Sequence, residues 1–323
     1  MTEHSIAVII PYYQSGPGLL QRALESILAQ EYQPAQVIIV DDGSPHPVQR
    51  EFTDELKKRL PCPTIVRQEN QGVSAARNAA LSNLLPDIDA IAFLDSDDQW
   101  MPRHLRNAAE ALSQGADFYF SNFVREGEAE DAFATDEGRR HLVSNSPGLV
   151  RWSRGIASLM RSSAPFTTSS VVFRRALKPD IRFPKRFRRA GEDHIVFWDL
   201  CLRATCIMYS PEVNVVYGNQ GVGLWRNATL GTREHLSRLA DEIRLRRYVI
   251  RHYPVQGEDR GRIRRAIESR RSQALYSALH LLHHRHFVLK EIAYLFWADP
   301  LSVPYWCVQA PRKIIGWAQA PRA

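Results

Sequence analysis

The sequence lacks any apolar run long enough to span a bilayer, and it has only four cysteines in 323 residues. Cys62, Cys201, Cys206 and Cys307 show neither CxxC spacing nor the density of a secreted disulfide scaffold, so reduced thiols are expected. A strand is predicted almost at the N-terminus, which leaves no room for a signal peptide. These absences favour a cytoplasmic protein without membrane spans.

Several recognition motifs are also absent. The first glycine turn lacks GxGxxG, which disfavours a classical dinucleotide-binding fold. No zinc-finger spacing, RNP-like aromatic signature or helix-turn-helix pattern is present, so no nucleic-acid partner is expected. His283, His284 and His286 have no carboxylate or cysteine nearby in the sequence, and a polar helix end is favoured there over a metal site.

Charge is unevenly distributed along the chain. Residues 1–122 contain 9 Lys and Arg against 16 Asp and Glu, whereas residues 233–323 contain 17 against 8. The basic, Trp-bearing C-terminal region suits the headgroup zone of an anionic membrane. An ordinary helical subdomain that packs its Trp residues inward is an equally acceptable interpretation. The charge pattern therefore indicates two functions in one chain.

Short apolar runs alternate with segments of helical spacing through the first third of the chain. Apolar, β-branched runs predict buried strands, and apolar residues three and four positions apart predict helices. This alternation predicts an α/β fold with a doubly wound, mostly parallel sheet, followed by a helical region. Strands are expected at residues 5–10, 36–40, 64–66, 91–94, 117–120 and 169–173, and helices at 19–30, 48–60, 73–84, 195–202 and within 232–286.

Polar groups suited to a nucleotide follow four of the predicted strands. Pro11-Tyr12-Tyr13-Gln14 offers an aromatic face, Asp42 an acceptor for a pyrimidine imide, and Arg77 a fixed cation for uracil or phosphate. Asp95-Ser96-Asp97 offers hard oxygen ligands of the kind that Mg²⁺ or Mn²⁺ prefers. Because strand ends meet at one sheet edge, these groups are expected to form one ligand site.

Each group also has a structural interpretation. Tyr12 and Tyr13 could cap the core, Asp41 and Asp42 could cap a helix, and Arg77 could form an ion pair. Asp-x-Asp alone recurs in solvated turns. The arrangement of all four groups at strand ends is what favours a nucleotide site.

Four stretches together resemble family 2 glycosyltransferases, which are inverting enzymes with the GT-A fold. They are residues 7–13, 40–44, 72–78 and 93–98, in the order and roughly the spacing of that family. The resemblance covers about residues 5–220. The residues Ile10-Pro11-Tyr12-Tyr13-Gln14 and Asp42-Gly43-Ser44-Pro45 are similar more particularly to bacterial exopolysaccharide glucosyltransferases of the succinoglycan type.

The resemblance implies a UDP-sugar donor whose diphosphate is bridged by Mn²⁺ or Mg²⁺. Pro11, Tyr13, Asp42, Arg77, Asp95 and Ser96 would then bind the nucleotide sugar. Asp42 would read uracil, Asp95 would lie toward the ribose or the sugar, and Asp97 would bind the metal. The metal would act as a Lewis acid that offsets charge on the leaving diphosphate.

Gly191-Glu192-Asp193 looks like the acidic pair of the family, which implies that Asp193 is the general base. Glu192 and Asp193 could instead cap the following helix. The basic run Lys185-Arg186-Phe187-Arg188-Arg189 could hold a diphosphate of the acceptor. Within this run, Arg188 and Arg189 are the candidates for acceptor contacts, since they stand nearest to Asp193 in the sequence. Glu192 and Trp225 are further candidates for acceptor or loop contacts.

The sequence thus predicts a metal-dependent enzyme that adds one glucose from UDP-glucose in β linkage. The expected acceptor is a polyprenyl-diphosphate-linked oligosaccharide at the inner face of a bacterial membrane. The QxxRW signature and the membrane spans of processive synthases are absent. A sugar-phosphate nucleotidyltransferase and an inactive nucleotide-sugar-binding membrane scaffold are the alternatives.

The expected domains are a GT-A domain at residues 1–231 and a helical, basic region at 232–323. Within the first, residues 1–122 would bind the nucleotide sugar and residues 123–231 would form the acceptor side.

Overall fold

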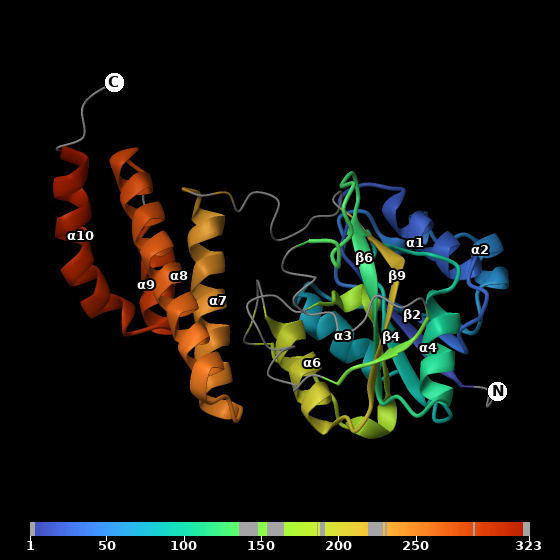
Figure 1. Ribbon diagram of the computed structural model, residues 1–323. Helices are drawn as coiled ribbons and strands as arrows, with labels where there is room; N and C mark the ends of the chain where they lie inside the picture. Colours follow the sequence, from blue (N-terminus) through green and yellow to red (C-terminus); the bar gives the residue numbers. More distant parts are fainter. Residues whose placement is uncertain are drawn as a thin grey trace. The chain divides into compact units, whose positions relative to one another are not determined.

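A computed structural model of the chain describes residues 4–135, 148–153, 165–185, 187, 191–218, 229, 231–286 and 288–318, without the side chains of residues 259 and 312–318. The chain divides into two compact units (Figure 1). One comprises residues 1–188 and 192–223, and the other residues 189–191 and 224–323. The domain boundaries and the functions assigned to each half of the first domain stay predictions.

Nine strands among the described residues of the first unit form one sheet in the order β3-β2-β1-β4-β8-β6-β9-β5, and β7 pairs with β9. The strands are β1 (Ile6–Tyr12), β2 (Gln36–Asp41), β3 (Pro63–Arg67), β4 (Ala90–Phe93), β5 (Gln99–Trp100), β6 (Phe118–Arg125), β7 (Val150–Arg151), β8 (Val171–Arg174) and β9 (Ile207–Tyr217).

The pairing of the strands differs between the two sides of the sheet. β3, β2, β1 and β4 run parallel to one another, as their continuously apolar sequences predict. β8 is antiparallel to β4 and to β6, while β6 and β9 are parallel. The predicted α/β fold is therefore confirmed, with a parallel half joined to a mixed half.

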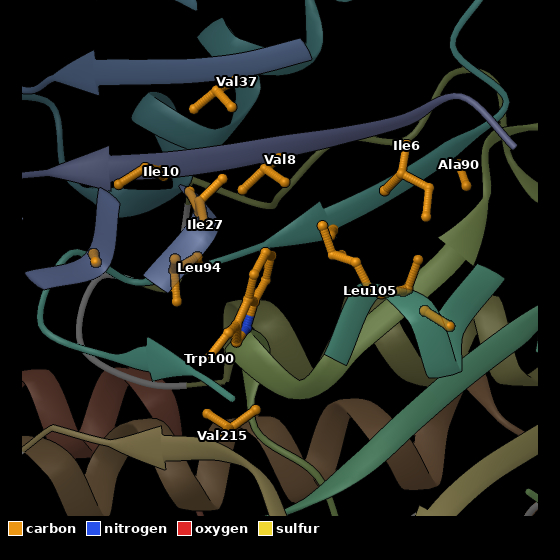
Figure 2. Packing of buried hydrophobic residues seen from close by; sticks show 14 of the residues in the cluster. Ile6, Val8, Ile10, Ile27, Val37, Ala90, Leu94, Trp100, Leu105 and Val215 are labelled. Carbon is orange, nitrogen blue, oxygen red and sulfur yellow. The ribbon is translucent and has the colours of Figure 1, made fainter. Parts of the chain in front are cut away.

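Helices cover both faces of this sheet, which makes it doubly wound. The helices of the first unit are α1 (Leu19–Leu28), α2 (Asp54–Arg59), α3 (Val73–Leu81), α4 (His104–Ser113) and α6 (Glu192–Arg203). Side chains alternate along β1, so Val8 packs in the cluster that holds α1 and α4, and Ile9 in the cluster that holds α3 and α6. Figure 2 shows the first cluster, to which Ile27 of α1, Trp100, and Leu105 of α4 belong.

Several predicted elements differ in their bounds; the strand expected at 117–120, for example, extends to Arg125 as β6. The helix expected at 48–60 is a 3₁₀ turn, Val48–Arg50, followed by α2. Between them, the buried Glu51 accepts hydrogen bonds from the Tyr12 hydroxyl and from the Gly18 amide. The Thr53 side chain then caps α2 by accepting from Leu56. A tertiary contact and a cap thus divide what periodicity predicts as one helix.

The strand expected at 169–173 begins at Val171, after a 3₁₀ turn at Thr168–Ser170. The Ser170 hydroxyl bonds the Thr167 backbone in this turn, which competes with strand pairing. The helix expected at 73–84 ends at Leu81, where the Ser82 hydroxyl binds the carbonyl of Asn78.

The second unit is helical, as predicted. It contains α7 (Arg233–His252), α8 (Gly257–His283), α9 (Leu289–Ala298) and α10 (Ser302–Ala318). Pro254 lies between α7 and α8 and prevents one continuous helix. Leu239, Ile243 and Leu295 belong to its buried core. None of the described helices has both the length and the apolarity needed to cross a membrane.

Candidate active site

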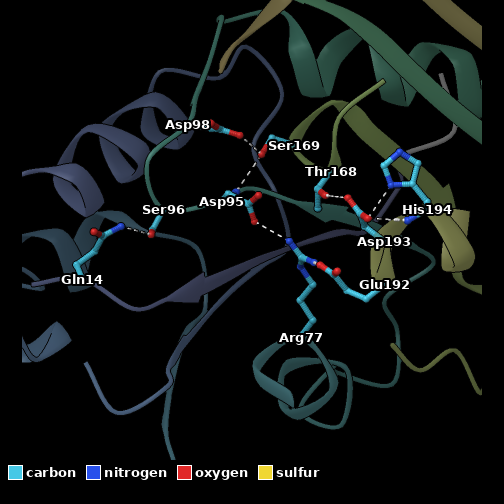
Figure 3. A network of polar contacts seen from close by, with 10 residues as sticks. All are labelled: Gln14, Arg77, Asp95, Ser96, Asp98, Thr168, Ser169, Glu192, Asp193 and His194. Atoms are coloured by element: carbon cyan, nitrogen blue, oxygen red, sulfur yellow. Dashed lines mark hydrogen bonds and ion pairs between the residues drawn. The ribbon is translucent and has the colours of Figure 1, made fainter. Parts of the chain in front are cut away.

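The candidate site lies where the parallel strands of the first unit end. β4 ends at Phe93, and the chain continues into residues 95–98, here called the acidic loop. Ser169 holds this loop: its hydroxyl accepts from the Asp95 amide at 3.0 Å and donates to the Asp98 carboxylate. Figure 3 shows these contacts. The strand end and the turn before β8 therefore fix the loop together.

The end of β9 closes on the acidic loop from the other side. The Gly218 amide donates to Asp98 at 2.7 Å. A Cβ atom at Gly218 would lie 1.9 Å from the carbonyl oxygen of Asp97, so no larger residue fits there. Asp98 is buried, and burial first, then the charges of Asp95 and Asp97, raise its pKa well above the ordinary value.

Arg77, on α3, joins the acidic loop to α6. Its Nη2 donates to Asp95 Oδ1 at 2.9 Å and its Nη1 to Glu192 Oε1 at 3.0 Å (Figure 3). The guanidinium carbon lies 5.2 Å from the ring centroid of Phe183. The Arg77 side chain is 4% exposed, and its pair with Glu192 is buried, whereas Asp95 is partly exposed. Burial alone would lower the pKa of Arg77, but the neighbouring carboxylates raise it, and the group stays charged.

Asp193 lies in the first turn of α6 beside Glu192. Its Oδ2 accepts from the Thr168 hydroxyl at 3.1 Å, and its Oδ1 lies 2.9 Å from His194 Nδ1. Burial alone would raise the pKa of Asp193, but His194 and then Arg77 hold it below the ordinary value. Asp193 is therefore an ionised acceptor at neutral pH, with a side chain that is 24% exposed.

The neighbouring Glu192 behaves in the opposite way. Burial, and then the charge of Asp193, raise the pKa of Glu192 to about 7, while Arg77 opposes them. Two adjacent carboxyl groups thus differ in protonation behaviour because one faces inward and the other contacts His194 and Thr168.

The carboxylates of Asp41 and Asp42 accept hydrogen bonds from the loops that follow β2 and β3. Asp41 accepts from the amides of Ser44 and Val48, which is a structural contact. Asp42 accepts from the Gln68 side chain and from the amides of Gln71 and Gly72, directly before α3. The function of Asp42 in uracil binding stays a prediction.

The loop after β1 contributes Tyr13 and Gln14. Tyr13 is 39% exposed, so its ring is available to a ligand. Gln14 donates to the Ser96 hydroxyl at 3.0 Å and thereby ties this loop to the acidic loop. Pro11 is buried and pairs with Val40 of β2. The pairing of β1 with β4 ends at Ile9, so the lack of an amide hydrogen at Pro11 costs no hydrogen bond between these two strands. Their contacts with a nucleotide stay predictions.

The donor set for a metal consists of hard oxygen atoms. Asp95, Ser96 and Asp97 follow one another in the acidic loop, and Asp95 and Asp97 are partly exposed. Among the described residues, no cluster of three or more His, Cys, Asp or Glu could hold an ion. Two carboxylates fit Mg²⁺ or Mn²⁺ when a diphosphate and water complete the coordination.

The structure brings together four of the predicted site residues: Arg77, Asp95, Glu192 and Asp193. The contacts of Arg77 link Asp95 with Glu192, next to Asp193, through atoms from three elements. Arg188, Arg189 and Trp225 lie outside the described residues, so the acceptor contacts predicted for them stay predictions.

Four residues of the network are absent from the candidate sites predicted from sequence: Asp98, Thr168, Ser169 and His194. Asp98 directly follows Asp97, and His194 directly follows Asp193. This adjacency to predicted site residues could have identified both from the sequence. Thr168 and Ser169 stand at least 70 residues from the acidic loop, and no sequence motif marks them as site residues.

Comparison with known proteins agrees with this architecture. Residues 7–177 match the model of the family described as glycosyl transferase family 2. Over 231 residues the chain is 32% identical to the succinoglycan biosynthesis protein ExoW of Rhizobium meliloti, covering 69% of this chain and 71% of that protein. Over 256 residues it is 28% identical to ExoO of the same organism, covering 76% and 69%.

Solved structures share the fold. Staphylococcus aureus TarS 1–349 in complex with UDP-GlcNAc has a TM-score of 0.56 and 18% identity, over 84% of this chain and 81% of that one. The mannosyltransferase PcManGT from Pyrobaculum calidifontis, in complex with GDP-Man and Mn²⁺, has a TM-score of 0.55 and 16% identity, over 96% and 84%. The match of the family model to more than half of the chain, together with the similarity to ExoW, shows that this protein belongs to glycosyl transferase family 2.

Proposed function

We propose that this glycosyltransferase adds one glucose from UDP-glucose, in β linkage and with inversion, to a lipid-linked exopolysaccharide repeat unit. The observation that carries the proposal is the buried bridge in which Arg77 joins Asp95, of the acidic loop, to Glu192, beside Asp193. The bridge couples a diphosphate-binding loop to a carboxylate suited to proton transfer. The names of the relatives ExoW and ExoO support the succinoglycan-like acceptor.

The donor occupies the strand ends in this proposal. Asp42 reads the uracil, Tyr13 offers an aromatic face, Asp95 lies toward the ribose or the sugar, and Asp97 binds the metal. Arg77 acts by positioning, since both of its Nη atoms already bind carboxylates. UDP-GlcNAc in TarS and GDP-Man with Mn²⁺ in PcManGT support a nucleotide sugar and a divalent cation for this fold.

Asp193 is the general base in the proposed transfer. The acceptor oxygen bonds to the anomeric carbon from the face opposite UDP, the bond from that carbon to the phosphate oxygen breaks, and UDP leaves with the electron pair. The acceptor proton passes to the Asp193 carboxylate. The hydrogen bonds from the Thr168 hydroxyl and the His194 amide orient this carboxylate, and its lowered pKa keeps it ionised at neutral pH. Bound Mn²⁺ or Mg²⁺, held by Asp97, would supply Lewis-acid stabilisation of the leaving diphosphate.

The proposed acceptor carries a polyprenyl diphosphate, so the enzyme would work as a peripheral protein at the cytoplasmic face of the membrane. The basic second unit supports this location through attraction to anionic lipid.

The first test is thermal stabilisation by a panel of nucleotide sugars with Mn²⁺ or with a chelator. A ligand that binds the folded state raises the melting temperature by mass action. We expect metal-dependent stabilisation by UDP-glucose, lost in Asp97→Asn, followed by transfer to a lipid-linked acceptor with a β anomeric signal in NMR spectra. Binding without transfer would favour the scaffold alternative, and pyrophosphate release from UTP and a sugar phosphate would favour the nucleotidyltransferase.

A further inference from the structure

The segment from residue 292 to residue 311, which covers most of α9 and α10, exposes only apolar residues. Between residues 292 and 311, every exposed residue is apolar: Ala293, Trp297, Pro300, Leu301, Val303, Pro304, Cys307, Val308 and Pro311. We call this set the apolar face. Ala293 and Trp297 are four positions apart on α9, and Val303, Cys307 and Pro311 repeat at the same spacing on α10, so each helix shows an apolar stripe.

The apolar face is additional to the surface that these helices bury. Leu295 is fully buried in the core of the second unit, and Ile292, Phe296 and Trp306 pack against that core. An ordinary surface helix has polar residues opposite its buried side. Here the opposite side exposes 63% of Trp297, 57% of Leu301 and 54% of Val308. Large side chains exposed together in this way mark an interaction surface.

The same segment shows no charge at its surface. Asp299 is the one charged residue between positions 292 and 311, and it is fully buried. Arg247 and Arg271 bind its carboxylate, as does the Ser302 hydroxyl. The ionic group of this segment is thus satisfied inside the unit, and the apolar face can enter a nonpolar environment without carrying a charge with it.

Cations lie beside the apolar face. The guanidinium carbon of Arg244 lies 4.4 Å from the ring centroid of Trp297, and Lys290 is exposed in the first turn of α9. An exposed Trp with adjacent cations and apolar neighbours suits the boundary between lipid headgroups and acyl chains. The surplus of Lys and Arg over Asp and Glu in residues 233–323 would repel a second copy but attract an anionic surface.

We propose that the apolar face of α9 and α10 inserts into the interfacial layer of an anionic bilayer and docks the enzyme there. This deepens the proposed function, since a lipid-linked acceptor lies in a bilayer, but docking is measured without any sugar transfer.

The test uses the full chain and sedimentation with vesicles of phosphatidylcholine, with or without phosphatidylglycerol. We expect binding to the anionic vesicles that weakens with salt. Leu301→Glu with Val308→Glu should reduce the affinity about tenfold or more, because two apolar contacts become two negative charges near an anionic surface. Leu85→Glu with Met101→Glu, which makes the same charge change at two exposed apolar residues of the first unit, should reduce it much less.

A label at Cys307 gives an independent readout. Cys62 and Cys307 are exposed, whereas Cys201 and Cys206 are buried, so Cys62→Ser directs an environment-sensitive dye to the apolar face. Its emission should shift to the blue when anionic vesicles are added.

Two binding results would overturn the proposal: absence of vesicle binding at low salt, or equal affinity of the two double variants for anionic vesicles. The proposal would also be overturned if the wild-type protein were a dimer in solution and the Leu301→Glu, Val308→Glu variant were a monomer. The last result would assign the apolar face to a second copy. Stabilisation by UDP-glucose without vesicle binding would retain the proposed function and reject the docking surface.

Discussion

At the scale of single residues, the candidate site depends on carboxylates whose surroundings make them different. Asp193 and Glu192 are neighbours, yet burial raises the pKa of Glu192 while His194 and Arg77 lower that of Asp193. The partly exposed, ionised Asp193 carboxylate can meet an acceptor hydroxyl, and the buried Glu192 suits structural pairing with Arg77.

Replacing the proposed base should separate chemistry from binding. Asp193→Asn keeps the size of the side chain but removes the basic carboxylate, so transfer should fall by a factor of about 10²–10⁴. UDP affinity, measured by calorimetry with Mn²⁺, should stay nearly unchanged, and Asp180→Asn should leave both unchanged. A large loss of UDP affinity would make Asp193 a structural residue instead.

Removing the bridging cation should destabilise the first unit. Arg77→Met leaves Asp95 and Glu192 without their shared partner, and breaking a buried pair costs about 3 kcal/mol. The free energy of unfolding in urea should fall by about that amount. Arg106→Met removes the exposed pair with Glu31 and should cost less than about 1 kcal/mol. Equal losses in the two variants would show that Arg77 behaves as a surface residue.

The raised pKa of Glu192 predicts a pH dependence of stability. Between about pH 4.5 and 7 the folded state keeps a proton that the unfolded state releases, so the contribution of Glu192 to stability falls as the pH rises through that window. Glu192→Gln should flatten the stability curve there in urea titrations at several pH values, whereas Glu55→Gln, at an exposed position, should not. Parallel curves for wild type and Glu192→Gln would contradict this assignment.

At the scale of elements, the candidate site forms where the ends of β4 and β9 and the turn before β8 lie together. β4 supplies the acidic loop, the turn before β8 supplies Ser169, and β9 ends at Gly218 against that loop. The acidic loop is thus positioned by segments that follow it by more than 70 residues in the sequence.

The contact between Gly218 and the acidic loop predicts a strong effect of one methyl group. In Gly218→Ala the added carbon would collide with the Asp97 carbonyl, and overpacking of this kind costs about 2 kcal/mol. Metal-dependent stabilisation by the donor should also weaken, because the loop must shift. Gly16→Ala, where a Cβ meets no atom within 4 Å, should change neither quantity in thermal denaturation. If Gly218→Ala kept the stability and the donor response of the wild type, the acidic loop would be able to move away from the added methyl group without cost.

At the scale of the whole molecule, the chain combines an α/β unit with a basic helical unit. Each unit has its own buried core: the sheet clusters in one, and Leu239, Ile243 and Leu295 in the other. Separate cores favour separate resistance to proteolysis.

Limited proteolysis of the full chain should therefore leave two protected fragments that divide near residue 231. The larger fragment should keep metal-dependent stabilisation by the donor, because every residue assigned to donor binding precedes residue 123. Mass spectrometry of the fragments locates the cuts. Protection of the chain as one piece would contradict the predicted boundary.

The sequence by itself determined the fold class, the family and the positions of the acidic and basic groups, since these depend on local patterns. Apolar runs specified β1, β2 and β4 because buried parallel strands need continuous apolar residues. The motif Asp95-Ser96-Asp97 and the pair Glu192-Asp193 are recognisable as short, contiguous strings of residues.

Only the tertiary structure decided which of these groups touch. Arg77 binds both Asp95 and Glu192, Ser169 holds the acidic loop, and Thr168 and His194 contact Asp193. Such contacts join segments that are far apart in the sequence, and local periodicity does not predict which distant segments will meet. The division of the helix predicted at 48–60 has the same origin, since Glu51 turns inward to Tyr12 across 39 positions. The apolar face of α9 and α10 likewise required the fold, because apolar residues in a sequence do not reveal which of them the core will cover.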